Sequence, residues 1–194
     1  MIRLATPSDA RAVAEIYGPI VRSTAISFET EEPSEAEMKR RIVSTLSYAP
    51  WLVWEEGGAI AGYVYATRHR DRMAYQWSVD VTAYTHERYR RKGIGRALYR
   101  ALFDLLRLQK FYRAHAGITL PNAASVGLHE SLGFRFIGAY PAVGFKLGAW
   151  HDVGWWQLPL LEPIEAPSPP LTLPEAQALP AWQAAYGAVI GPVP

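Results

Sequence analysis

The fold of this chain is decided by the stretch Tyr84-Thr85-His86-Glu87-Arg88-Tyr89-Arg90-Arg91-Lys92-Gly93-Ile94-Gly95-Arg96-Ala97-Leu98. It runs from the predicted end of a strand, through a basic loop, into an amphipathic helix. Gly93 and Gly95 allow a sharp turn that brings a ligand close to consecutive backbone N–H groups. Unpaired N–H donors at a helix start favour a phosphate or pyrophosphate. The stretch therefore predicts an anion site; the alternative is a basic helix start on an ordinary surface.

Two common phosphate-binding loops do not fit this stretch. A Walker loop needs Gly-x-x-x-x-Gly-Lys-Ser/Thr, which is absent here. A dinucleotide loop needs Gly-x-Gly-x-x-Gly, and position 98 is Leu. The anion is therefore predicted to be held by a different kind of loop.

Composition excludes several classes of function. The 194 residues are 49% hydrophobic and 20% charged, which is typical of a globular protein. A net charge of +2 does not favour nucleic acid as a partner. The chain contains no cysteine, so disulfides and thiolate metal sites are excluded. There is no signal-peptide core and no apolar run of membrane-spanning length, so we expect a cytoplasmic protein that does not enter membranes.

Hydrophobic periodicity predicts an α/β (α+β) protein with a mixed sheet and helices on both faces. Ser34 and Glu37 form a capping-box pattern, Asn122 is placed to cap a helix, and Gly133 is placed to end it. The segment 144–151 is rich in turn residues. Strands are expected at 2–5, 51–55, 59–65, 75–84, 115–119, 134–140 and 153–160, and helices at 8–22, 34–46, 94–109 and 122–133.

A change in composition divides the chain near residue 161. Residues 1–161 are expected to form the main domain, and 162–194 a Pro/Ala-rich C-terminal extension. Residues 162–174 are expected to be an extended linker. Residues 175–190 are expected either to form a weak helix that packs back on the domain or to remain a tail.

Several motifs together resemble the GNAT superfamily of acetyl-CoA-dependent N-acetyltransferases. Arg90-x-x-Gly93-x-Gly95 is similar to the pyrophosphate loop of that family, and 122–134 is similar to its second signature. The segments 75–80 and 144–158 resemble the phosphinothricin acetyltransferase subfamily, whose relatives act on methionine sulfoximine and arsinothricin. This resemblance covers about residues 2–160. It implies the GNAT fold, in which two splayed strands of a mixed sheet bind acetyl-CoA.

The resemblance also implies which residues bind acetyl-CoA. Ala83, Tyr84 and Thr85 are expected to contact the acetyl and pantetheine portion through their backbone. The pantetheine arm is assigned to Asn122, with Ser125 on the same helix. The residues expected at the pyrophosphate are Arg90, Arg91, Lys92, Gly93, Ile94, Gly95 and Arg96.

Proton transfer is assigned to Asp80 and His129. A primary ammonium must lose a proton before it attacks a thioester, and a carboxylate or imidazole supplies the base directly or through a water. Asp80 aligns with a Glu of the subfamily but is one methylene shorter, so proton abstraction would run through a water, or another group would act as the base instead. The alternative for Asp80 is an ion pair with a nearby arginine that only orders its strand. His129 aligns with a proton donor of the family and alternatively only packs against the cofactor.

The acceptor is predicted to be a small amino acid or an amino-acid-like antimetabolite. Arg72 is a candidate for its carboxylate. The candidates for the rim of its site are Phe28, Glu29, Lys146 and Trp150. Arg72 is alternatively an ordinary solvated loop residue. No metal is expected, because the histidines do not show a metal-ligand spacing. The resemblance implies a homodimer that contacts its partner near 144–156, and a role in antibiotic or herbicide resistance.

Two competing functions remain open at this point. One is acetylation of a protein N-terminus or lysine, which needs an open groove, whereas the aromatic loops favour a small closed pocket. The other is a CoA-binding sensor without turnover, for which the Asp at position 80 is the only indication.

Overall fold

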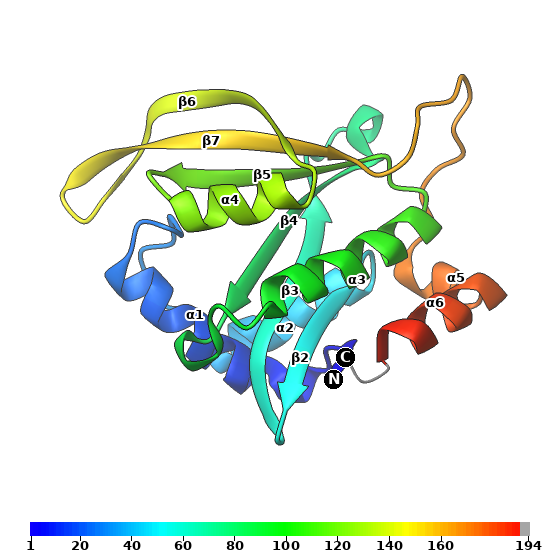
Figure 1. Ribbon diagram of the computed structural model, residues 1–194, viewed down its shortest axis with the longest axis horizontal. Helices are drawn as coiled ribbons and strands as arrows, with labels where there is room; N and C mark the ends of the chain where they lie inside the picture. Colours follow the sequence, from blue (N-terminus) through cyan, green and yellow to red (C-terminus); the bar gives the residue numbers. More distant parts are fainter. Residues whose placement is uncertain (191–194) are drawn as a thin grey trace.

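The computed structural model describes residues 1–190, and the last four residues of the predicted extension lie outside this range. The strands form one mixed sheet in the order β1-β2-β3-β4-β5-β7-β6 (Figure 1). All neighbours are antiparallel except β4 and β5. The strands are β1 (Ile2–Leu4), β2 (Trp51–Glu56), β3 (Ala59–Arg68), β4 (Ser78–Thr85), β5 (Arg113–Leu120), β6 (Arg135–Lys146) and β7 (Ala149–Pro159).

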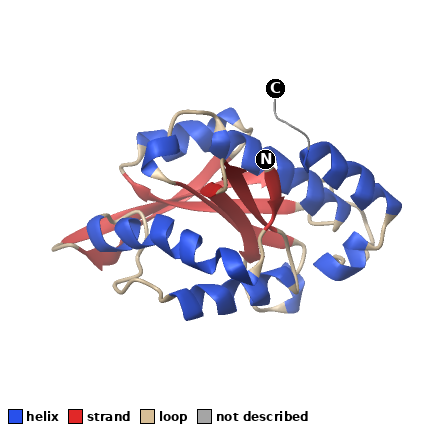
Figure 2. Cartoon of the chain, turned by 90° about the horizontal axis from the view of Figure 1, so that it is seen from below, coloured by secondary structure: helices blue, strands red, loops and turns tan. Residues whose placement is uncertain are grey.

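Helices cover both faces of this sheet, as Figure 2 shows. On one face α1 and α2 bury an aromatic and aliphatic cluster that includes Val13, Trp51 and Tyr63. On the other face α3 and α4 pack against a larger cluster that includes Leu98 and Leu102. The predicted mixed sheet with helices on both faces is confirmed. The helices are α1 (Ala10–Ser23), α2 (Glu35–Leu46), α3 (Ile94–Leu108), α4 (Ala123–Ser131), α5 (Leu173–Gln177) and α6 (Pro180–Ile190).

The predicted N-caps are present, but only one half of the capping box at Ser34 and Glu37 forms, because the Glu37 carboxylate pairs with Arg40 and Arg41. The Ser34 side chain accepts a hydrogen bond from the backbone N–H of Glu37 at the start of α2. The Asn122 side chain likewise accepts from Ser125 N–H at the start of α4, and Gly133 has a positive φ of 95° just after that helix. Each cap satisfies backbone groups that a helix end leaves unpaired.

The two parallel strands β4 and β5 pair only briefly. Their register runs from Ser78 opposite Arg113 to Asp80 opposite His115, and the paired residues end there. Beyond this point β4 continues to Thr85 and β5 to Leu120. A gap therefore opens in the middle of the sheet, directly before the loop that leads into α3.

Two sequence predictions about strand limits were wrong. The strand expected at 75–84 begins at Ser78, because Met73–Tyr75 form a short 3-10 helix. The expected turn at 144–151 is a continuous hairpin, in which β6 and β7 are joined by Leu147 and Gly148 in left-handed conformations. An irregularity between Tyr140 and Gly144 shifts the register of this hairpin. The turn-forming residues near Gly144 thus lie in an irregular part of β6, and only those at 147–148 form the turn.

The C-terminal extension packs back on the domain. Trp182 in α6 is 1% exposed and belongs to the cluster beneath α3. The buried side-chain amide of Gln109 donates to the carbonyls of Tyr48 and Leu171, both at 2.8 Å. The Tyr186 hydroxyl accepts a hydrogen bond from Leu4 N–H at 2.9 Å. Of the two states expected for 175–190, the structure has the packed helix.

Among the described residues, no helix combines the length and the apolar character needed to cross a bilayer.

Candidate active site

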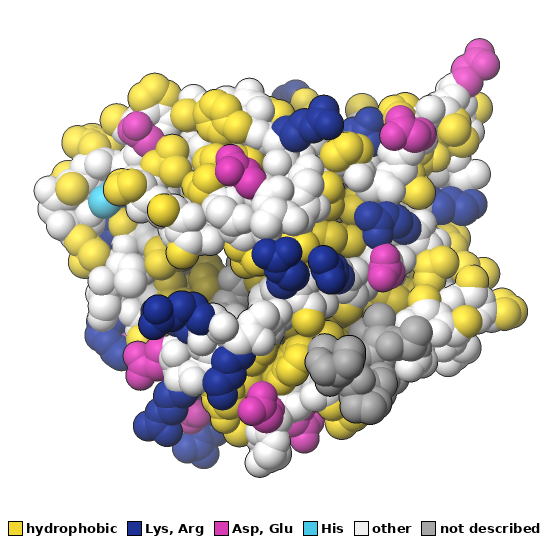
Figure 3. All heavy atoms as spheres, viewed as in Figure 1, with side chains coloured by type: hydrophobic (Ala, Val, Ile, Leu, Met, Phe, Trp, Pro, Cys, Tyr) yellow, Lys and Arg dark blue, Asp and Glu magenta, His cyan; other side chains and the backbone are white. Residues whose placement is uncertain are grey.

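A cavity of about 600 Å³ opens between the gap in the sheet, the start of α3 and the start of α4. Figure 3 shows a hollow on this face of the molecule with Lys and Arg side chains beside it. The structure brings eleven of the predicted cofactor residues into the wall of this one cavity. They are Ala83, Tyr84, Thr85, Arg90, Arg91, Gly93, Ile94, Gly95, Arg96, Asn122 and Ser125.

The loop before α3 has the backbone shape of an anion cradle. Gly93 is the N-cap of α3 with φ 80°, and Arg91 also has a positive φ of 62°. A Cβ built on Gly93 would meet nothing within 4 Å, so this backbone faces open space. The N-terminal N–H groups of α3 carry the positive end of the helix dipole. The cavity wall at this loop therefore suits a pyrophosphate, and the volume and largely apolar lining of the cavity suit the pantetheine arm of acetyl-CoA.

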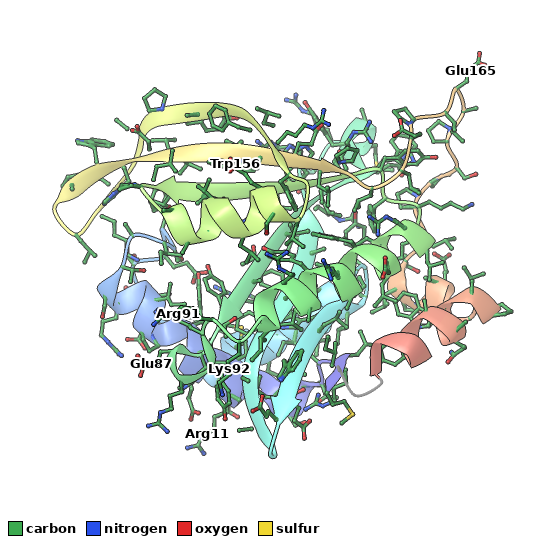
Figure 4. All side chains as sticks on the ribbon, viewed as in Figure 1. Arg11, Glu87, Arg91, Lys92, Trp156 and Glu165 are labelled. Atoms are coloured by element: carbon green, nitrogen blue, oxygen red, sulfur yellow. The ribbon has the colours of Figure 1, made fainter. Side chains whose placement is uncertain are left out.

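Lys92 is the predicted cofactor residue that does not line this cavity. Its ammonium lies 5.1 Å from the centre of the Tyr89 ring. Figure 4 shows Arg91 and Lys92 on the loop that precedes α3. The Lys92 side chain is exposed, so it contributes to the local positive field rather than to the wall of the cavity.

His129 is buried at the inner end of the cavity and pairs with Tyr99. Its Nδ1 lies 2.8 Å from the Ser125 carbonyl oxygen, so Nδ1 carries a proton and donates it. Its Nε2 lies 3.0 Å from the Tyr99 hydroxyl. In the neutral imidazole Nε2 is an acceptor. Burial lowers the pKa of His129 and favours this neutral form.

Asp80 lies on the opposite face of the sheet from α3. Strand alternation places Val79 and Val81 in the cluster beneath α3, and Asp80 on the face that α1 covers. Asp80 Oδ1 lies 2.6 Å from Nδ1 of His69. Burial raises the pKa of the Asp80 carboxyl, and the hydrogen bond with His69 only partly offsets this rise. The alternative role expected for Asp80 was an ion pair with an arginine. No such pair is present among the described residues.

His115 completes a cluster with His69 and Asp80, whose ligand-type atoms all lie within 4.8 Å of one another. The histidine spacing in the sequence gave no sign of this proximity. The imidazoles of His69 and His115 are stacked, with centroids 4.1 Å apart and planes at 18°. Stacked rings direct their nitrogens side by side instead of at one point, so this geometry fits a hydrogen-bonded group better than metal coordination.

Glu29 and Phe28, two of the residues predicted to bind the acceptor, differ from each other in their contacts. Glu29 accepts hydrogen bonds from both terminal nitrogens of Arg41 and from the Tyr17 hydroxyl. Burial alone would raise the pKa of Glu29, but these donors lower it below its usual value. Phe28 is 38% exposed and lies against Gly144 of β6.

Lys146 and Arg72 were also expected to bind the acceptor, and neither lies in the wall of a described cavity. Lys146 is 7% exposed, and its ammonium donates to the Ser27 carbonyl at 2.7 Å. Burial lowers the pKa of this ammonium. Arg72 is exposed at the start of a short 3-10 helix and lines none of the described cavities, whereas Arg70 lines a small cavity of about 170 Å³ beside His69. Lys146 thus ties the hairpin to the 24–33 loop.

Sequence reasoning missed several residues of the site. Tyr99 lines the large cavity and follows Gly95 by one helical turn, and that spacing was the available signal. Ile26 and Leu128 also line it, as apolar residues with no distinctive pattern. His69 directly follows β3 and His115 lies in β5, and only the strand register reveals that they meet.

Comparison with known proteins agrees with this geometry. Residues 2–155 match the acetyltransferase (GNAT) domain. The chain is similar to phosphinothricin N-acetyltransferase of Streptomyces viridochromogenes, with 39% identity over 169 residues that cover 87% of this chain and 90% of that protein. It is also similar to the L-methionine sulfoximine/L-methionine sulfone acetyltransferase of Salmonella typhimurium, with 36% identity covering 83% of this chain and 95% of that protein.

A solved structure shares the fold over most of the chain. It is that of a GNAT superfamily phosphinothricin acetyltransferase from Sinorhizobium meliloti in complex with acetyl-CoA. Its TM-score is 0.81 at 35% identity, covering 89% of this chain and 97% of that one. These matches confirm the predicted N-acetyltransferase class and its acetyl-CoA co-substrate. Because the family match spans most of the chain, and close relatives cover it along nearly their full length, this chain belongs to the GNAT family of acetyltransferases.

Proposed function

We propose that this enzyme transfers the acetyl group of acetyl-CoA to the primary amine of a small, amino-acid-like antimetabolite of the phosphinothricin or methionine sulfoximine type. The observation that carries this proposal is the large cavity, which joins a helix-start anion cradle to a gap in the sheet. The names of the relatives support the choice of acceptor. Acetylation removes the positive charge of the amine, so we further propose a role in resistance to such compounds.

The acceptor is proposed to approach from the face of the sheet that bears Asp80. Tyr84 of β4 packs on this face against Tyr17 of α1, with ring centroids 5.0 Å apart. The thioester would arrive from the α3 side and meet the amine at the gap between β4 and β5. Holding the two reactants together in this gap removes much of the entropic barrier to their reaction.

Each step of acetyl transfer has a proposed residue. The carboxylate of Asp80, together with the group bonded to it, forms the basic centre that lets the ammonium lose a proton. Backbone N–H groups of β4 beyond Asp80 face the gap, where they are placed to stabilise the oxyanion of the tetrahedral intermediate. His129 and Tyr99 form a hydrogen-bonded pair in the wall of the cavity and assist the proton that the CoA thiolate takes up.

The acceptor site is proposed to lie between Asp80, Glu29 and Phe28. Glu29 supplies a negative charge on this face, and Phe28 supplies an apolar wall. Arg72 has no ion pair among the described residues, so it is available for the acceptor's carboxylate. Lys146 acts indirectly, by fixing the loop that carries Phe28 and Glu29.

We also propose that the enzyme is a cytoplasmic homodimer. Acetyl-CoA is supplied in the cytoplasm. The β6–β7 hairpin exposes several large apolar side chains, which an isolated monomer rarely shows side by side. They are Phe136, Ile137, Tyr140, Val143, Phe145, Leu147 and Trp150, each about half or more exposed.

One assay tests the proposed function. Free thiol release from acetyl-CoA is measured with L-phosphinothricin, methionine sulfoximine, the standard amino acids, and peptides with a free N-terminus or lysine. We expect release with one or a few free amino-acid-like amines, and its loss in Asp80→Ala. Release only with the peptides would favour a protein acetyltransferase. Binding of CoA without thiol release from any amine would favour a sensor and contradict the proposal.

A further inference from the structure

Three strands bring His69, Asp80 and His115 together at the point where the sheet begins to open. Asp80 and His115 are opposite each other and are the last residues that β4 and β5 pair. His69 follows the end of β3 directly, and its backbone N–H donates to Ser78 of β4 at 3.4 Å. The cluster thus lies at the inner end of the gap in which the two substrates are proposed to meet.

The bond between His69 and Asp80 fixes which nitrogen of the imidazole carries a proton. The two atoms, Nδ1 and Oδ1, are 2.6 Å apart. An ionised carboxylate only accepts hydrogen bonds, so Nδ1 is the donor and Nε2 holds a free lone pair. Within residues 1–190, Nε2 of His69 has no hydrogen-bond partner. This is the arrangement of a carboxylate-oriented imidazole base.

Aromatic contacts hold the His69 ring in place. It stacks on His115, and the rings of Tyr75 and Trp155 meet it edge-on at centroid distances of 6.0 and 5.9 Å. Burial lowers the pKa of His115 to about 4, so His115 is neutral at neutral pH and does not oppose a charge on His69. Gln157 orients His115 through a contact of 3.0 Å with its Nε2.

The His69 ring also borders a space that adjoins the gap in the sheet. His69, His115, Tyr140 and Trp155 line the small cavity of about 170 Å³. The indole ring of Trp155 lies against Gly117, where a Cβ would come within 3.3 Å of it, and Gly117 itself faces the gap. The Trp155 ring therefore borders the smaller cavity and also contacts a residue that lines the gap. The volume of the smaller cavity accommodates a small ammonium group or a water.

We propose that His69 is the group that accepts the proton of the acceptor's ammonium, with Asp80 as the carboxylate that orients it. This rests on the proposed acetyl transfer. An N–H bond of the ammonium breaks, and the proton binds Nε2 of His69, directly or through one water. Asp80 balances the imidazolium charge. The free amine then attacks the thioester carbonyl, the C–S bond breaks, and the second proton of the nitrogen goes to the CoA thiolate. His69 afterwards releases its proton to solvent.

With His69 as the base, the Asp80 carboxylate does not have to reach the amine itself. An aspartate reaches one methylene less far than the glutamate expected there, and an imidazole bonded to it extends the basic centre by the width of a ring. The titratable groups around His69 are Asp80 from β4, His115 from β5, Tyr75 from the 3-10 helix Met73–Tyr75, Arg70 next in the chain, and Tyr140 from β6.

The test compares His69→Asn, His69→Phe, Asp80→Asn and the double variant His69→Asn/Asp80→Asn by pH-dependent steady-state kinetics. Asn keeps a donor near the Nδ1 position but has no basic nitrogen, and Phe keeps the ring packing. We expect both His69 variants to lose about 100-fold or more in kcat, the usual scale for a general base, with the KM for acetyl-CoA within about twofold. The kcat of the double variant should be no lower than that of the less active single variant, because the two residues act as a unit.

The pH profile separates a base from a packing residue. In the unaltered enzyme the acidic limb of kcat/KM should report the imidazole, and in His69→Asn that limb should move to lower pH or disappear. A His69→Phe variant with near-normal kcat, or a His69→Asn variant with an unchanged acidic limb, overturns the proposal while acetyl transfer itself stands.

A measurement without turnover keeps the proposal testable by itself. The tautomer of the His69 imidazole is determined by nuclear magnetic resonance in the unaltered enzyme and in Asp80→Ala. We expect the proton on Nδ1 when Asp80 is present, because an ionised carboxylate only accepts hydrogen bonds, and a shift toward the other tautomer in Asp80→Ala. The same tautomer population in both proteins overturns the inference whatever the acceptor panel shows. Absence of thiol release with every amine would instead overturn the proposed function.

Discussion

The hydroxyl oxygen of Tyr99 lies 3.0 Å from Nε2 of His129, and both side chains line the cavity proposed for acetyl-CoA. This bond joins α3 to α4 at the inner end of the cavity. The neutral imidazole can accept from Tyr99 but has no proton of its own to give from Nε2. A proton given to a CoA thiolate by this pair would therefore come from the Tyr99 hydroxyl or pass through it.

Replacing His129 by Ala should lower kcat strongly and affect acetyl-CoA binding only slightly. We expect a loss of about 100-fold in kcat, the usual scale for one proton-transfer group. Tyr99→Phe should lower kcat less, since the ring and its packing remain. Steady-state kinetics with saturating acceptor checks both variants. Equal, small effects of both would mean that the pair only packs beneath the cofactor.

The anion cradle should depend on backbone shape more than on any one charge. Gly93→Val places a β-branched residue at φ 80°, which costs about 1–2 kcal/mol in the left-handed region. We expect the KM for acetyl-CoA to rise about tenfold, a change that corresponds to about 1.4 kcal/mol. Lys92→Ala is the matched control, because this side chain lies outside the cavity wall, and it should change the KM by less than threefold. A larger effect of Lys92→Ala would show that charge dominates.

Trp182 should be one of the most costly residues to truncate, although it lies beyond the family core. It is 1% exposed, and replacing a buried Trp by Ala typically costs about 3–5 kcal/mol. The exposed neighbour Gln183→Ala should cost less than about 0.5 kcal/mol. Urea unfolding followed by tryptophan fluorescence or circular dichroism measures both. A Trp182→Ala variant as stable as the unaltered protein would mean that the extension is dispensable.

Glu29 should make stability depend on acid. Its pKa is lowered in the folded protein, because the donors Arg41 and Tyr17 outweigh the effect of burial. Such a group contributes stability above its unfolded pKa, near 4.5, and this contribution is lost as the pH falls through the lower folded value. The unaltered protein should therefore lose more of its melting temperature between pH 6 and pH 3 than Glu29→Gln does. Parallel melting curves would contradict this assignment.

The exposed hairpin should hold two copies together. Phe145 and Trp150 are 60% and 66% exposed and lie against each other across β6 and β7. The double substitution Phe145→Glu/Trp150→Glu should convert a dimer to a monomer, because it would place four carboxylates in one apolar interface. Light scattering coupled to gel filtration measures the mass. A monomeric unaltered protein would remove the proposal of a homodimer.

The parts of the structure that depend on short stretches of sequence were predictable. The loop 90–96, the cap at Asn122 and the cap at Ser34 each rest on residues within one or two turns. The order of strands and helices followed from periodicity and from the resemblance. The gathering of the loop and the Asn122 helix around one cavity followed from the same resemblance.

The parts that depend on strand register were not predictable from a single sequence. His69 and His115 are far apart in the chain, and they stack only because Asp80 is opposite His115 while β3 ends beside β4. The two strands of the hairpin at 135–159 were predicted to be separated by a longer turn, because Gly144 and Gly148 look alike in sequence. One lies in a strand under Phe28, and the other forms the turn.

The brief pairing of β4 and β5 leaves the centre of the sheet incomplete, with backbone groups beyond Asp80 and His115 facing a space instead of a neighbouring strand. The pantetheine arm is itself a chain of amides, so on the proposed binding mode it takes the place of the missing ladder. The free energy of unfolding of this enzyme should consequently increase by RT ln(1 + [L]/Kd), where [L] is the concentration of acetyl-CoA. In a starved cell the same molecules would be both idle and easier to unfold, so that supply of the acetyl donor governs how long they last as well as how fast they work.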